Sequence, residues 1–270
     1  MPRPFEGLAD EPEWIALREL VPAASAPLRL RPDVAARHGD RPVTLSTVLP
    51  MAWPAMTRAD GRVLVGLQRH VQSGDVSRDL AVAIMCALAT EPGGTVAVPT
   101  LPGEGPRLQD ILDDGPLAIE MHDGFEYWMG DDQADDPNVK ASLERANASI
   151  YPTVRLSAAR AAYWCRVPEK GHIRWVLAEQ EDAALNALSR LSAANELVLG
   201  DRTKFAGMFR AHGLLVPVWD IPREPEAAEW EAPLADFAKR YADTLADGSP
   251  LDSAARRAKQ GLVGRQLTLR

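Results

Sequence analysis

Cysteine is nearly absent from this chain of 270 residues, which holds only Cys86 and Cys165. Two cysteines do not make a disulfide framework, and neither belongs to a CxxC pair. Hydrophobic runs are short as well, since the longest is about half of the ~20 residues that a membrane-spanning helix needs. The first residues of the chain lack the apolar core of a signal peptide. These absences predict a cytoplasmic protein that does not associate with membranes.

Positive charge is also in deficit, with 30 lysines and arginines against 38 aspartates and glutamates and a net charge of −8. A surface of that balance repels phosphate backbones, so the composition disfavours nucleic-acid binding. The end of the chain is the exception, because basic residues outnumber Asp252 there: Arg256, Arg257, Lys259, Arg265 and Arg270. This basic tail suits an acidic surface of its own chain, a partner or RNA, and the acidity of the remaining chain favours the first.

Motifs of known chemistry are missing too. The five histidines show neither HExxH nor HxH spacing, and the chain contains no GxxxxGK[ST] phosphate loop and no GxSxG nucleophile motif. The sequence therefore assigns no catalytic residue, no metal and no cofactor. It leaves enzymatic activity open and favours a binding role.

A hairpin pattern that recurs in both halves is the most informative feature present. In each half a strand-like run precedes a turn that ends in glycine, and a second run and a helix follow. The two turn glycines, Gly61 and Gly171, lie 110 positions apart (171 − 61). The runs are Val43–Leu49 and Arg62–Gln68 in the first half, and Ala161–Val167 and His172–Leu177 in the second. This spacing predicts an internal duplication, with two unrelated α+β halves as the alternative.

The predicted fold is α+β, built from tandem pseudo-duplicated units of order α-βββ-α-ββ and followed by C-terminal helices. Residues 22–42, rich in proline and arginine, are expected to run over the surface, and Thr95–Leu101 and Leu117–His122 to form a strand pair. The predicted boundaries are a first unit over 1–130, an acidic linker over 131–137, a second unit over 138–223, and C-terminal helices with a basic tail over 224–270.

This element order resembles secretion-chaperone-like folds, in which a sheet packs on helices and two copies pair through their central helices. The resemblance concerns element order alone. The predicted duplication in turn implies a groove where the two units meet. A fold of this kind does not establish function.

Several stretches also resemble an uncharacterised actinobacterial protein family. The stretches are Arg107–Leu112, Ser142–Asn147, Ala162–Arg166, His172–Leu177 and Phe209–Asp220. Members of that family often carry an N-terminal Cys/His zinc motif similar to the one at the end of the secretory ATPase SecA, and this chain has none. The family has no assigned activity, so the resemblance implies no catalytic residue.

Four basic side chains of the second half form the candidate binding site: His172, Arg174, Arg210 and His212. Strand alternation places His172 and Arg174 on one face of a strand, and the other two flank the turn of the last hairpin. Such a face suits an anionic ligand or an acidic peptide. The alternative is a hydrated sheet face whose charges pair with Glu169 and Glu179.

Two acidic groups are weaker candidates. His122, Asp123 and Glu126 suit a cation or acid–base chemistry, although a solvated turn explains them as well. Asp131, Asp132, Asp135 and Asp136 offer oxygen ligands for calcium, although they lack the EF-hand pattern and read better as the acidic linker.

The leading functional hypothesis is a protein-binding or chaperone-like module whose sheet face or groove takes a segment of a partner. The surplus of tryptophans, seven in all, supports it, although core packing accounts for most of them. The alternative is an enzyme or small-molecule binder with a pocket around the four basic residues, and a weaker one is RNA or ribosome association through the basic tail. The sequence does not distinguish a monomer from a homodimer.

Overall fold

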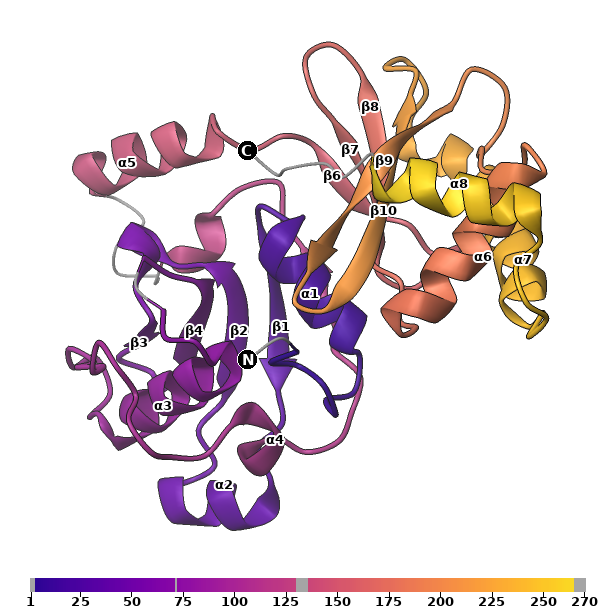
Figure 1. The fold of residues 1–270 in the computed structure, drawn as a ribbon. Coiled ribbons are helices and arrows are strands. Elements are labelled where there is room, and N and C mark those ends of the chain that lie inside the picture. The colour runs from indigo at the N-terminus through magenta and orange to yellow at the C-terminus, as the bar shows by residue number, and fades with distance from the viewer. Residues whose placement is uncertain (1–2, 71, 130–135, 265–270) are drawn as a thin grey trace. The chain divides into compact units, whose positions relative to one another are not determined.

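The computed structural model describes residues 3–70, 72–129 and 136–264. The chain divides into two compact units, Met1–Ile150 and Tyr151–Arg270, and each contains a five-stranded sheet with helices (Figure 1). The predicted α+β class is therefore confirmed. Among the described residues, every helix is too short or too polar to cross a bilayer.

The sheet of the first unit has the order β3-β4-β2-β1-β5, with β2 and β4 parallel and the other neighbours antiparallel. Its strands are β1 (Ala24–Leu28), β2 (Val43–Val48), β3 (Ala55–Thr57), β4 (Val63–Gln68) and β5 (Glu120–Met121). The helices of this unit are α1 (Glu11–Glu19), α2 (Pro32–His38), α3 (Val76–Ala89), α4 (Leu108–Ile111) and α5 (Pro137–Asn147), with 3-10 turns η1 (Pro50–Ala52) and η2 (Glu126–Trp128).

Helix α3 illustrates how the sequence positions an element in this unit. Asp75 caps its first turn by accepting a hydrogen bond from the backbone N–H of Arg78. At the other end, the Arg41 guanidinium donates to the carbonyls of Ala87, Leu88 and Thr90. A cation at this end satisfies free carbonyls and complements the helix dipole. Helix α3 is thereby held at both ends against β3 and β4.

The predicted element order is wrong for the first unit, which reads α1-β1-α2-β2-β3-β4-α3-α4-β5-α5 when its 3-10 turns are left out. Residues 22–42 contain β1 and α2 rather than a surface segment without regular structure. No strand forms over Thr95–Leu101, and β5 is only two residues long and pairs with β1. The prolines of residues 22–42 indicated a loop, but Pro27 lies within β1, near the edge of the sheet, where strands tolerate proline.

The second unit follows the prediction closely. Its strands are β6 (Thr153–Arg155), β7 (Ala162–Arg166), β8 (Gly171–Trp175), β9 (Lys204–Ala211) and β10 (Leu214–Ile221), and its helices are α6 (Glu181–Ala193), η3 (Ala227–Trp230), α7 (Glu231–Leu245) and α8 (Ser253–Val263). The sheet is fully antiparallel, with the order β6-β7-β8-β10-β9. His212 and Gly213 connect β9 to β10 with φ angles of 46° and 89°, the left-handed pair that a tight two-residue hairpin turn requires.

The core of the second unit lies between its sheet and its helices. Trp219 of β10 is fully buried and meets Phe205 and Phe237 edge-on, with ring centroids 5.8 and 4.9 Å away. The face of α6 that periodicity predicts, with Leu185, Leu188 and Leu191, packs in the same cluster. Residues of α7 and α8 pack there as well, so the C-terminal helices belong to the core of this unit.

The strand topology does not repeat between the units. Three consecutive strands, β6, β7 and β8, lie side by side in the second sheet, whereas β2 and β3 of the first are separated by β4. The duplication and the chaperone-like pairing thus gain no support from the strand order. The division between the units follows Ile150, so α5 lies in the first unit. Of the predicted acidic linker 131–137, residues 131–135 lie outside the described ranges.

Candidate functional site

The predicted site residues of the second unit lie on two faces of its sheet. His172 and Arg174 share the face opposite to that of Ile173, which packs in the helix-covered core. Arg210 of β9 pairs with Leu215, a residue of that core, so its side chain belongs to the helix-covered face. Strand alternation thus brings His172 and Arg174 together and separates Arg210 from them.

Arg210 and His212 have local structural roles. The Arg210 guanidinium donates to Glu181 Oε1 at the start of α6, from Nε at 2.8 Å and from Nη2 at 2.5 Å. This contact raises the pKa of Arg210 and lowers the pKa of Glu181. His212 occupies the first left-handed position of the β9–β10 turn. Neither residue shares a sheet face with His172.

His172 belongs to a charged row across the second sheet. Asp220 lies opposite it on β10, with 3.0 Å between His172 Nδ1 and Asp220 Oδ1, and Lys170 Nζ donates to Asp220 Oδ2 at 2.6 Å. Burial lowers the pKa of His172, and the charge of Arg174 lowers it further, against the attraction of Asp220. The Asp220 carboxylate is thus paired with Lys170, while the lowered pKa keeps the His172 imidazole neutral at pH 7.

We expect His172 to lower the stability of the fold as the pH falls. In the unfolded chain it binds a proton near pH 6.5, whereas in the folded chain it does so only at lower pH. Between those two values the unfolded state holds more protons, so stability rises with pH and is lost as the pH drops below about 6.5. A nuclear magnetic resonance titration of the imidazole, with urea unfolding of the wild type and His172→Gln between pH 5 and 7, checks this. A His172 that titrates at or above 6.5 contradicts it.

His122 lies in a polar cluster of the first unit rather than on a solvated turn. Its Nε2 lies 2.8 Å from Ser25 Oγ, and its ring stacks on Tyr127 with centroids 4.5 Å apart. Glu126 is occupied elsewhere, since its Oε1 accepts from Asn147 Nδ2 at 2.8 Å. Among the described residues, no three His, Cys, Asp or Glu side chains gather as a metal site requires. Of the predicted calcium ligands, Asp131, Asp132 and Asp135 fall outside these residues, and Asp136 caps α5.

The described part of the basic tail contacts its own unit. Lys259 of α8 donates to Asn186 Oδ1 on α6 at 2.9 Å and lies 3.7 Å from Asp182 Oδ1. Arg256 Nη1 donates to the carbonyl of Leu251. Arg265 and Arg270 lie outside the described residues. The described part of the tail thus contacts an amide, a backbone carbonyl and one carboxylate of its own unit.

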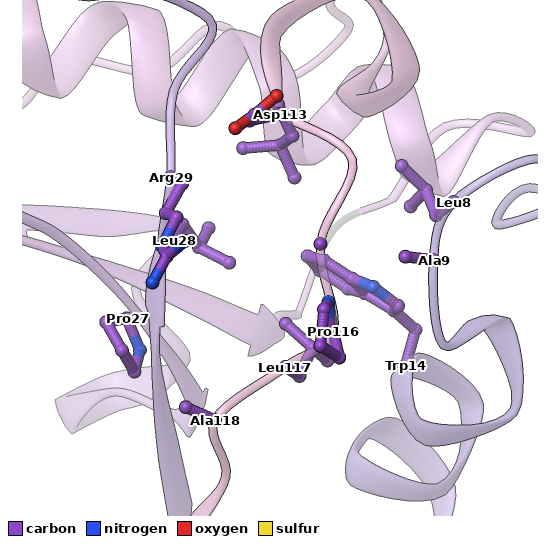
Figure 2. Close-up of a pocket in the computed structure, with 12 residues that line it drawn as sticks. Leu8, Ala9, Trp14, Pro27, Leu28, Arg29, Asp113, Pro116, Leu117 and Ala118 are labelled. Carbon is purple, nitrogen blue, oxygen red and sulfur yellow. The ribbon is translucent and has the colours of Figure 1, made fainter.

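A pocket of about 280 Å³ opens in the first unit where β1 separates from the segment 112–120 (Figure 2). β1 pairs with β5 at Ser25 and Glu120, and beyond both strands an isolated bridge joins Leu30 to Leu112. Between those points β1 and the residue after it supply four residues (26–29) and the other segment supplies seven (113–119), so the longer segment must bow outward. The bow leaves a hollow that is closed at both ends by strand pairing.

Proline accounts for the position of this opening. The carbonyls of Ala23 and Arg29 accept from the N–H groups of His122 and Asp113, so the odd-numbered residues of β1 direct their backbone groups to this edge. Pro27 falls on the same side and has no N–H to donate. The neighbouring segment therefore separates from β1 at Pro27, where the separation breaks the fewest backbone hydrogen bonds.

The pocket has an apolar floor and a charged rim. Trp14 is 2% exposed and stacks on Phe5, with 5.7 Å between ring centroids, and its indole faces the hollow beside Leu117 (Figure 2). Arg29 and Asp113 are exposed on opposite sides of the opening. The remaining lining residues are Leu8, Ala9, Pro27, Leu28, Leu112, Gly115, Pro116 and Ala118.

Sequence reasoning missed this pocket because its walls are far apart in the chain. Residues 8–14, 27–29 and 112–118 come together only through the pairing of β1 with the segment 112–120. The local signals were Pro27 and the pair Gly115-Pro116, which indicate a break in a strand and a turn. Neither signal reveals that the two segments face one another.

Comparison with known proteins concerns nearly the whole chain. A family model described as a family of unknown function, DUF5926, matches residues 4–270. No curated protein and no solved structure matches. The match agrees with the resemblance of the sequence to an uncharacterised family, which carries no assigned activity. The chain therefore belongs to the family of unknown function DUF5926.

Proposed function

We propose that this protein is a cytoplasmic binding module that captures one apolar side chain of a protein partner in the pocket between β1 and the segment 112–120. The observation that carries the proposal is the closed bow, which holds an apolar hollow open beside a sheet edge. Buried pockets of this type accept the anchor residues that dominate protein–protein affinity. A catalytic role has no comparable support.

The shape of the pocket favours a side chain over a whole strand. An added strand needs a long open edge, whereas here pairing at Ser25 and at Leu30 closes the hollow at both ends. A volume of about 280 Å³ lies just below the usual range for sites of drug-sized ligands. The pocket is therefore suited to one large aliphatic or aromatic group, with the backbone of the partner lying across the mouth.

The rim supports a second candidate function, the binding of a free apolar amino acid. Within the described residues, neither the Arg29 guanidinium nor the Asp113 carboxylate takes part in an ion pair, although Asp113 accepts a hydrogen bond from the N–H of Asp114. Placed at the two sides of one opening, they complement the carboxylate and the ammonium group of a zwitterion. The two candidate functions use the same pocket. They differ at its mouth, where the first requires the backbone of a partner and the second requires the charged groups of a free amino acid.

Three small probes separate the candidates. N-acetyl-L-leucinamide carries the side chain without charges, L-leucine carries it as a zwitterion, and N-acetyl-L-aspartamide replaces it with a carboxylate. Burying one such side chain contributes about 1.5–3 kcal/mol, so we expect millimolar or weaker binding, detected as shifts of the Trp14 and Leu117 resonances. Binding of the leucinamide supports the anchor pocket, and binding of leucine alone supports the amino-acid site.

A matched pair of variants tests whether the probes bind in this pocket. Ala118→Phe fills the hollow from an exposed position and should abolish binding, whereas Ala36→Phe places the same ring on exposed α2 and should leave it unchanged. Failure of both leucine probes to bind the wild type, or binding that survives Ala118→Phe, overturns the proposal.

A further inference from the structure

A second hollow of the first unit adjoins the anchor pocket between β1 and the segment 112–120. It measures about 370 Å³ and shares four lining residues with the pocket: Leu8, Ala9, Leu112 and Asp113. Arg31 and Asp114 line the second hollow but not the first. The two hollows are therefore contiguous, and a partner segment whose anchor fills the pocket has room for neighbouring side chains beside it.

The two sides of this continuous opening carry charges of opposite sign. Arg29 and Arg31 belong to the β1 side and are exposed, and residues two apart in an extended backbone share a face. Asp113 and Asp114 belong to the facing segment and are exposed as well. Figure 2 shows Arg29 and Asp113 on opposite sides of the opening. One side is thus positive and the other negative.

These four charges are not compensated by ion pairs within the described residues. Asp33 follows Arg31 by two positions but pairs with Arg37, with 2.8 Å between Oδ2 and Nη2. Asp113 accepts a hydrogen bond from the backbone N–H of Asp114 at 3.1 Å, and that donor carries no charge. The charges therefore stay available to a segment that lies across the opening.

We propose that the partner segment carries one acidic and one basic side chain on opposite sides of its apolar anchor. The inference rests on the proposed function, since it names the chemistry of the segment that enters the anchor pocket. The carboxylate meets Arg29 and Arg31, and the cation meets the two aspartates. In an extended segment, the side chains two positions before and after the anchor face the same surface as the anchor, so the charges belong at those positions.

Charge of a single sign does not suit this opening. A segment with two acidic or two basic side chains is attracted by one side and repelled by the other, and like charges placed together suppress the wrong partners of an interface. A segment with one charge of each sign is attracted by both sides. The opening therefore selects for the distribution of charge around the anchor as well as for its apolar side chain.

Five blocked pentapeptides with a central leucine test the inference on the full chain. Two carry opposite charges, Glu-Ala-Leu-Ala-Lys and Lys-Ala-Leu-Ala-Glu, and the others carry two glutamates, two lysines or two glutamines at the same positions. One of the two oppositely charged peptides should bind about three- to thirtyfold more tightly than the glutamine peptide, because two exposed ion pairs are added. The gain should shrink as salt screens the charges. Shifts of the Trp14 and Leu117 resonances measure the affinities.

The peptides separate this inference from the proposed function. If the glutamine peptide binds and neither oppositely charged peptide exceeds it, the inference is overturned while the anchor pocket stands. Tightest binding by the peptide with two lysines or two glutamates also overturns it, because only one side of the opening then contributes. If no peptide binds, the proposed function fails as well. Ala118→Phe fills the pocket and should abolish the binding of all five.

Reversing the charges of the two sides then tests which residues select the peptide. A variant that combines Arg29→Glu and Arg31→Glu with Asp113→Lys and Asp114→Lys changes only exposed side chains. It should exchange the affinities of the two oppositely charged peptides and leave that of the glutamine peptide unchanged. Arg37→Gln removes an exposed arginine outside both hollows and should change none of them. An order of affinities that survives the reversal contradicts the inference.

Discussion

Replacing Trp219 by alanine is expected to lower the free energy of unfolding of the second unit by about 3–5 kcal/mol. The side chain is fully buried and contacts Phe205 and Phe237, so its removal leaves a large cavity in the core. The indole Nε1–H also donates to the carbonyl of Leu197 at 3.3 Å, so the substitution leaves a buried acceptor without its donor. Urea unfolding followed by far-ultraviolet circular dichroism measures the change.

The matched control for this prediction is Trp53→Ala. It removes the same side chain from a position that is 52% exposed, and should change stability by no more than about 0.5 kcal/mol. If the two substitutions cost the same, Trp219 is not the centre of a packed core.

The second large effect is expected at Asp79. Asp79→Ala should destabilise the first unit by about 3–5 kcal/mol, because it leaves the buried Arg69 guanidinium without its counter-charge. The carboxylate also accepts from the backbone N–H of Ser73 at 2.8 Å, which ties the segment before α3 to the helix. Thermal and urea unfolding of the purified variant give the size of the loss.

The double variant Arg69→Met/Asp79→Leu tests whether Asp79→Ala loses stability through the missing Ser73 hydrogen bond or through the isolated charge of Arg69. Apolar groups of similar size often replace a buried ion pair at little cost, so the double variant should recover most of the stability that Asp79→Ala loses. A double variant as unstable as the single one would show that the Ser73 contact, rather than the unpaired guanidinium, carries the effect.

The second unit was predictable because its signals are local. The apolar run at Ala162–Arg166, the alternation in Gly171–Trp175 and the His212-Gly213 turn between two apolar runs each specify an element without distant partners. The buried face of α6 follows from its period in the same way. In the first unit, the structure of a segment depends more on the strand with which it pairs than on its own sequence. β5 has two residues, and β1 contains a proline that is tolerated because the neighbouring segment has separated from it there.

The candidate site residues also divide into those that a local pattern places and those whose position depends on distant strand pairing. Alternation correctly placed His172 and Arg174 on one face, since both lie on a single strand. It did not place Arg210, because the face of β9 depends on its register with β10, which shifts between Val218 and Trp219. The Asp220 carboxylate that contacts His172 comes from a strand 48 positions further along (220 − 172).

By itself, the sequence determined the α+β class, the elements of the second unit and the membership of an uncharacterised family. These follow from composition, periodicity and residue-by-residue likeness, all of which are properties of neighbouring residues or of the chain as a whole. Only the tertiary structure decided where the hollows lie and which charges line them. The bow opposite Pro27 results from two pairings with unequal numbers of residues between them, and the hollow beside Trp53 has walls from residues 51–54, 69–70 and 98–100. Both depend on contacts between distant segments, which no local pattern specifies.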